Sequence, residues 1–175
     1  MGNLAIDINH GPNHAATDLL AKTVVRDGMI SIPVDVDLIA QRIGLEVQRM
    51  RLSDGTDGLL VKNEAYKPFK AVLDVGSGER RARFTLAHEI GHYVHKYQDH
   101  PDGELAGIVE RRNSLSSQGT DPEEIWANGF AAQLLMPARI VARLWGDGWS
   151  IDAMADMFNV SSLAMGTRVT SLGLR

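Results

Sequence analysis

Three histidines and a glutamate lie close together in the segment RFTLAHEIGHYVHK, residues 83–96. His88 and His92 are four residues apart, so on a helix both imidazoles project from one side, about one turn from each other. This spacing suits two nitrogen ligands of one tetrahedral Zn²⁺. Glu89 lies roughly a quarter turn away, where its carboxylate could reach a metal-bound water. The H-E-x-x-H pattern therefore predicts His88 and His92 as metal ligands and Glu89 as a general base.

A solvated polar face on a surface helix is the alternative to a metal site. The residues around the pattern argue against it, because Leu86, Ala87, Ile90 and Gly91 predict a mostly buried helix. Buried imidazoles and carboxylates need partners, which a metal ion would supply.

His95 is the third histidine and also falls on this side of the helix. Three ligands on one straight helix would have to converge across two turns, roughly 10 Å. We therefore favour a helix-end imidazole near exposed carbonyl groups over a third ligand.

A catalytic zinc site needs a third protein ligand and an open position for water. Glu124 is the best candidate, and Asn128 lies one turn further on the same helix face, where it could hydrogen-bond a ligating histidine. Glu123 is a competing ligand. Asp121 with Glu124 would form a capping box, and so would Thr120 with Glu123, and a capping box explains a glutamate without any metal.

The helices and strands expected around these residues indicate an α+β fold. Segments 45–50, 58–63 and 69–75 alternate like strands, which indicates a small antiparallel sheet. Ser77 and Gly78 mark the start of the histidine helix, and Pro122 suits the first residue of a second helix. We expect the sheet to pack on a helical body that carries the zinc helix and ends in a helix-turn-helix-like element at residues 150–174.

The composition is that of one globular domain. The chain has 175 residues, a net charge of −4 and no cysteine, so it offers no thiolate ligand and no basic surface for nucleic acid. We expect residues 1–30 to form an N-terminal arm and helix without an assigned role, and residues 31–175 to form the functional domain. No signal peptide or membrane span is evident, which predicts a cytoplasmic protein.

Three segments resemble the ImmA/IrrE family of zinc metallopeptidases. RFTLAHEIGH, residues 83–92, matches the family's zinc helix. Residues 111–137 are similar to its second block, with Glu, two spacers, Ala-Asn, Phe-Ala-Ala and Leu-Leu-Met-Pro. Residues 32–47 look like its N-terminal helix and strand. One departure is Trp126, where relatives often carry a polar residue, and we expect it to pack in the core.

The resemblance implies a zinc-dependent endopeptidase in which Glu124 is the third metal ligand, because the family's ligand stands three residues before Ala-Asn. Asn128 then falls where related zinc peptidases keep an acid or amide that supports a ligand. The implied substrate is a protein, commonly a helix-turn-helix repressor encoded nearby, in stress response or mobile-element regulation.

Two features stay open from the residues alone. Tyr93, Tyr97, His95 or His100 could each stabilise the oxyanion of a tetrahedral intermediate. AGIVERR, residues 106–112, could be an edge strand that pairs with an extended substrate or an ordinary surface strand.

A DNA-binding module is the rival function class, because residues 151–175 have the sequence pattern of a helix-turn-helix. Arg168 is the sole basic residue of its second helix, which favours a scaffold role over contact with DNA. A third possibility is a non-catalytic regulator or toxin–antitoxin component. Such a protein could lose Glu89 and still bind metal, whereas an enzyme could not, so the presence of Glu89 favours catalysis.

Overall fold

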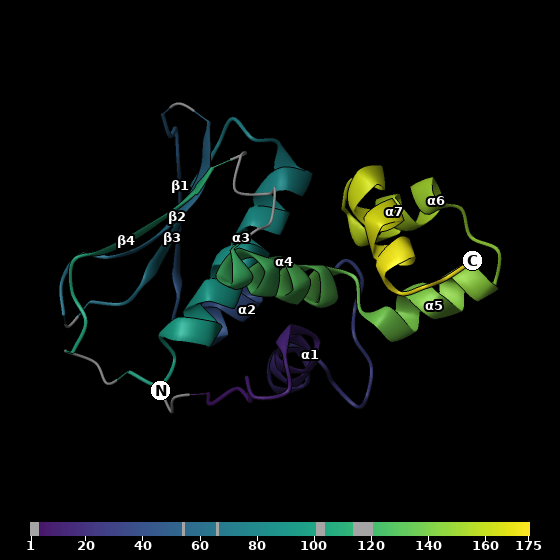
Figure 1. The fold of residues 1–175 in the computed structure, drawn as a ribbon, viewed down its shortest axis with the longest axis horizontal. Helices are drawn as coiled ribbons and strands as arrows, with labels where there is room; N and C mark the ends of the chain where they lie inside the picture. Colours follow the sequence, from purple (N-terminus) through teal and green to yellow (C-terminus); the bar gives the residue numbers. More distant parts are fainter. Residues whose placement is uncertain (1–3, 54, 66, 101–103, 114–120) are drawn as a thin grey trace.

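A computed structural model describes residues 4–53, 55–65, 67–100, 104–113 and 121–175 (Figure 1). The described strands are β1 (Glu46–Met50), β2 (Thr56–Lys62), β3 (Lys70–Asp74) and β4 (Ile108–Asn113). The described helices are α1 (Pro12–Thr23), α2 (Val36–Arg42), α3 (Glu79–Lys96), α4 (Pro122–Leu135), α5 (Ala138–Gly146), α6 (Ile151–Phe158) and α7 (Ser162–Ser171). The predicted α+β class is confirmed, with one small sheet against a helical body.

The sheet is mixed, whereas the sequence predicted an antiparallel one. Its strand order is β1-β3-β2-β4, and β2 runs antiparallel to both of its neighbours. β1 lies on the far side of β3 and pairs with it in parallel, with Val47 opposite Ala71. The alternating pattern of a strand predicts which side chains face the core, but it does not specify the partner strand or its direction.

Helix α3 lies between the sheet and α4, and small residues permit the close approach on both sides. A Cβ atom on Gly58 of β2 would lie 2.4 Å from Cγ2 of Thr85 in α3. A Cβ atom on Gly91 of α3 would lie 3.3 Å from Cα of Ala127 in α4. The Gly91 contact brings α4 against the helix face that carries the two histidines.

The N-terminal segment belongs to the same hydrophobic core as the rest of the chain. Helix α1 packs along α4, and its Ala16 and Leu19 are fully buried. Ile6 exchanges two backbone hydrogen bonds with the Gln98 side chain just beyond α3, at 2.9 and 2.8 Å. Residues 4–23 therefore support both helices of the candidate site, a role that the sequence did not indicate.

Helices α6 and α7 follow the predicted order and are joined by a tight turn. Asn159 adopts a left-handed conformation, with φ of 51°, and the Ser161 hydroxyl caps α7 by accepting a hydrogen bond from the backbone N–H of Ala164. This helix pair does not by itself establish a DNA-binding element. Arg168, the basic residue of α7, is 5% exposed and donates hydrogen bonds to the Met136 carbonyl and to Gln133. Among the described residues, no helix is both long and apolar enough to cross a membrane.

Candidate metal centre

Helix α3 carries His88, Glu89 and His92, and all three side chains are buried. The helix begins after Gly78, as predicted, and runs to Lys96. Leu86 and Ile90 are fully buried in the hydrophobic core, which fixes the rotation of the helix. The four-residue spacing then places the two imidazole rings 4.6 Å apart, on the side that faces α4.

Helix α4 brings Glu124 against these two rings. Asp121 accepts a hydrogen bond from the Glu123 N–H and Pro122 is the first helical residue, so Glu124 falls in the first turn as predicted. Nε2 of His92 lies 3.1 Å from Oε1 of Glu124, and Nε2 of His88 lies 3.3 Å from Oε2. The two Nε2 atoms are 3.0 Å apart. Three potential donor atoms from two helices thus converge on one point.

This donor set fits a tetrahedral zinc ion. Two Zn–N bonds of about 2.0–2.1 Å at a tetrahedral angle separate the nitrogens by about 3.3 Å, close to the observed spacings. His88, His92 and Glu124 also meet the geometric requirement of one donor atom each, all within 4.8 Å of one another. Two histidines and a carboxylate leave one position for water, which is the arrangement of a catalytic zinc site.

Asn128 lies on the opposite edge of the His88 ring. Its Oδ1 atom is 3.0 Å from Nδ1 of His88, so the amide can accept the Nδ1–H hydrogen bond. A proton held on Nδ1 leaves the Nε2 lone pair of His88 directed at Glu124 and His92. The one-turn spacing of Glu124 and Asn128 on α4 accounts for both contacts.

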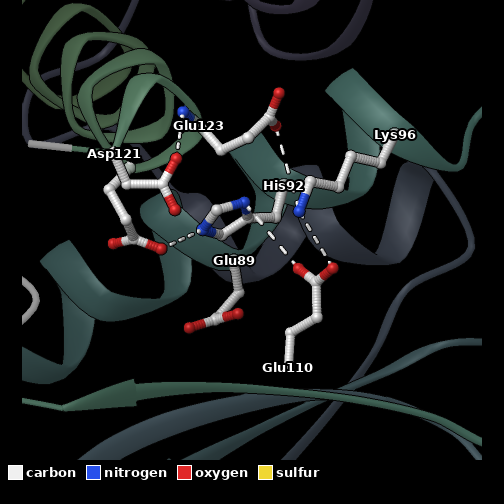
Figure 2. A pocket seen from close by; sticks show the side chains of 7 residues that line it. Glu89, His92, Lys96, Glu110, Asp121 and Glu123 are labelled. Atoms are coloured by element: carbon white, nitrogen blue, oxygen red, sulfur yellow. Dashed lines mark hydrogen bonds and ion pairs between the residues drawn. The ribbon is translucent and has the colours of Figure 1, made fainter.

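Glu89 points from α3 towards the sheet, below the His92 ring (Figure 2). A Cβ atom on Gly58 of β2 would lie 3.3 Å from its Oε1, so a larger residue there would crowd the carboxylate. Glu89 and His92 both line a pocket of about 250 Å³ next to the three converging donor atoms. Glu89 is therefore placed beside the potential metal position and is not one of the three converging residues.

The two alternative ligands, Glu123 and His95, lie together and away from this centre. Oε2 of Glu123 is 2.9 Å from Nδ1 of His95. Trp126 stacks on the His95 ring with 4.2 Å between centroids, and it also stacks on Phe130 at 5.4 Å. Trp126 is half-buried over this contact between α3 and α4. Thr120, considered for the alternative capping box, lies outside the described residues.

Glu110 of β4 is the main site residue that sequence reasoning did not single out. Its Oε1 accepts hydrogen bonds from the Tyr97 hydroxyl at 2.5 Å and from Nζ of Lys96 at 3.0 Å. Its Oε2 lies 3.8 Å from Nδ1 of His92. Alternation in the strand could have shown that Glu110 and Ile108 share a face, but a glutamate in a strand is usually a solvent-facing residue.

Three pKa shifts follow from this packing. Burial lowers the pKa of His92, so its imidazole is neutral at pH 7, as a metal ligand must be. Burial alone would raise the pKa of Glu110, but the hydrogen bonds from Tyr97 and Lys96 lower it overall, so Glu110 is a carboxylate. Burial and the bond to Glu110 raise the pKa of Tyr97, which therefore keeps its proton.

The four candidates for oxyanion stabilisation each contact another side chain. Tyr97 binds Glu110, and His95 binds Glu123. Tyr93 packs edge-on against Phe69, and exposed His100 lies 3.6 Å from Glu104. None of these contacts is with the three converging donor atoms.

A second group of potential ligands lies at the start of α1. Asp7, His10 and His14 have donor atoms within 4.8 Å of one another, but both histidines are exposed. The Asp7 carboxylate also accepts hydrogen bonds from the Asn9 backbone and side chain. Ion pairing and a local turn account for this group without a metal.

The fold and the site together define an α+β domain with the donor set of a metallopeptidase. The family Peptidase_M78, described as the IrrE N-terminal-like domain, matches residues 40–170. The chain therefore belongs to this ImmA/IrrE family of metallopeptidases. A comparison with curated proteins found no match.

Proposed function

We propose that the chain is a zinc-dependent endopeptidase that hydrolyses a protein substrate. The observation that carries the proposal is the convergence of two imidazoles and a carboxylate beside a buried glutamate, in a chain of a metallopeptidase family. His88, His92 and Glu124 would hold the zinc ion. When bound, zinc lowers the pKa of water and polarises the scissile carbonyl group.

Glu89 is the general base of the proposed reaction. Its carboxylate accepts a proton from the attacking water and then delivers that proton to the leaving amine. Asn128 holds the His88 ring through Nδ1, so that Nε2 keeps its lone pair for the metal. The pocket beside these residues gives the scissile bond access to both the metal position and Glu89.

The substrate enters in an extended conformation along β4 in this proposal. β4 is an edge strand of the sheet, and within the described chain only β2 pairs with it. Glu110 of β4 lines the same pocket as Glu89, so a peptide paired with β4 would pass the potential metal position. The family resemblance adds a more specific proposal: the substrate is a helix-turn-helix repressor encoded nearby, and the reaction takes place in the cytoplasm.

Replacement of Glu89 by glutamine tests catalysis separately from metal binding. We expect Glu89→Gln to keep its zinc and to lose about 10²–10⁴-fold in hydrolysis rate, because glutamine cannot accept the proton. The measurement is cleavage of the neighbouring repressor and of unfolded casein by protein loaded with one equivalent of zinc.

Glu79→Gln is the matched control, because Glu79 is an exposed residue at the start of the same helix. It should cleave at the wild-type rate. Full activity in Glu89→Gln, or no cleavage of either substrate by the zinc-loaded wild type, would contradict the proposal.

A further inference from the structure

The two histidines of the proposed metal centre differ in what holds the far side of each ring. Nδ1 of His88 faces the neutral amide of Asn128 at 3.0 Å. Nδ1 of His92 is buried, and within the described part of the chain it makes no hydrogen bond. A buried ring nitrogen without a hydrogen bond lowers the stability of the fold, so a nearby group that can accept a hydrogen bond from it would stabilise the site.

Glu110 is the group that faces Nδ1 of His92. Figure 2 shows its carboxylate across the pocket from the imidazole, and the closest approach is 3.8 Å, from Oε2. The other oxygen, Oε1, accepts hydrogen bonds from Tyr97 and Lys96, two residues from the last turn of α3 and its end. The carboxylate is thus held at one oxygen and presents the other to His92.

We propose that Glu110 is a positioning residue that accepts the Nδ1–H hydrogen bond of His92 and so orients this imidazole for metal binding. The inference rests on the proposed function, because it takes His92 to be a ligand through Nε2. A metal at Nε2 requires that the ring proton sits on Nδ1, which makes Nδ1–H a donor aimed at Glu110.

The contact needs only a small adjustment to become a hydrogen bond. An N–H···O bond spans about 2.7–3.2 Å, and the present separation is 3.8 Å. Small changes in the Glu110 side-chain torsions would move Oε2 towards the ring, and the flexible Lys96 side chain can follow Oε1 as it shifts. Carboxylate–histidine–metal triads of this kind raise the basicity of the ligand and set its orientation.

The position of Glu110 has a structural consequence for the site. Glu110 belongs to β4, the edge strand proposed to pair with substrate, whereas both histidines belong to α3. The Glu110 side chain therefore connects β4, the strand proposed to pair with substrate, to the proposed metal centre. The alternative is that Glu110 has no positioning role and that its ion pair with Lys96 only joins β4 to α3.

Zinc affinity separates these two roles. The dissociation constant of zinc is measured by competition with a chromophoric chelator, for the full-length wild type and for Glu110→Ala and Glu110→Gln. We expect Glu110→Ala to weaken zinc binding about 10–100-fold, the usual effect of losing a partner behind a ligand. Glu110→Gln should lose less, because its amide oxygen can still accept from His92, although its NH2 group then faces Lys96 and Tyr97 and no longer accepts their hydrogen bonds.

Glu123→Ala is the matched control, because Glu123 lines the same pocket and contacts the same Lys96 at 3.9 Å but faces His95. It should bind zinc like the wild type. A second readout is the Nδ1-bound proton of His92 in zinc-loaded protein labelled with ¹⁵N. We expect a slowly exchanging, downfield signal in the wild type and in Glu110→Gln, and its loss in Glu110→Ala.

The outcomes distinguish this inference from the proposed function. Equal zinc affinity and an unchanged His92 proton signal in folded Glu110→Ala would overturn the positioning role and leave the zinc site intact. An equal loss of affinity in Glu123→Ala would also overturn it. No zinc binding by the wild type would overturn the proposed function itself.

Discussion

At the residue scale, the site depends on the tautomers of two imidazoles. His88 and His92 direct Nε2 at the same carboxylate, and the two rings differ in the partner of Nδ1. Asn128 can accept a hydrogen bond from Nδ1 of His88 but cannot bind the proposed metal from that position, since it lies behind the ring. Its contribution is to hold the proton and the ring orientation that a metal ligand needs.

Asn128→Ala tests that contribution. We expect zinc affinity to fall about 10–100-fold, because the Nδ1–H of His88 loses its acceptor and the ring becomes free to rotate or change tautomer. Asn128→Asp should keep an acceptor oxygen in the same place and retain most of the affinity. Chelator competition measures both variants, and wild-type affinity in Asn128→Ala would show that the amide does not support the ligand.

Sequence reasoning could predict the residues of the cluster because their spacing is local. His88 and His92 share a helix face by periodicity, and Glu124 and Asn128 do so on a second helix. The sequence also led us to expect that Glu124 lies close to the two histidines, and in the fold the three side chains lie together. Glu110 was not identified, because its partner His92 is 18 positions away and belongs to another element, so no local pattern marks the contact.

At the element scale, the crossing of α3 and α4 sets the distance between the histidines and Glu124. Gly91 lies at this crossing, where a Cβ atom would meet Cδ1 of Phe130 at 3.1 Å and Cα of Ala127 at 3.3 Å. Ala127 lies between Glu124 and Asn128 along α4, so a shift at the crossing would move both residues away from the rings.

Gly91→Ala should therefore destabilise the protein despite the better helix propensity of alanine. Alanine in a helix interior gains about 0.5–1 kcal/mol over glycine, but overpacking costs about 1–3 kcal/mol. We expect lower stability in urea denaturation together with weaker zinc binding. Gly166→Ala in α7 is the matched control, because its Cβ would lie 3.7 Å from the nearest atom, an ordinary contact. A stabilised Gly91→Ala variant would contradict this account of the crossing.

The sheet shows why element pairing was harder to predict than element position. The three strand segments were predicted close to their observed bounds, and the α+β class followed from them. The parallel pairing of β1 with β3 was missed, because the strand order depends on contacts between distant segments. The mixed sheet still leaves β4 at an edge beside the pocket. Pairing of residues 106–112 with an extended substrate requires such an edge position.

At the scale of the whole molecule, the proposed metal would connect two helices that different parts of the fold hold in place. The sheet supports α3 from one side, and α1 packs along α4 from the other. Arg168 of α7 anchors the C-terminal helices to the end of α4 through Gln133 and Met136. The one basic side chain of α7 is thus engaged in a contact with α4.

The neighbouring residues Glu123 and Glu124 allow the most direct test of the metal centre. They have the same chemistry and adjacent positions, but Glu124 faces His88 and His92, whereas Glu123 faces His95. The measurement is the zinc content per chain of protein purified without chelator, for the wild type, Glu124→Gln and Glu123→Gln. We predict about one tightly held zinc ion in the wild type and in Glu123→Gln, and its loss in Glu124→Gln. A wild type without a divalent ion, or zinc lost from Glu123→Gln and kept by Glu124→Gln, would contradict the account.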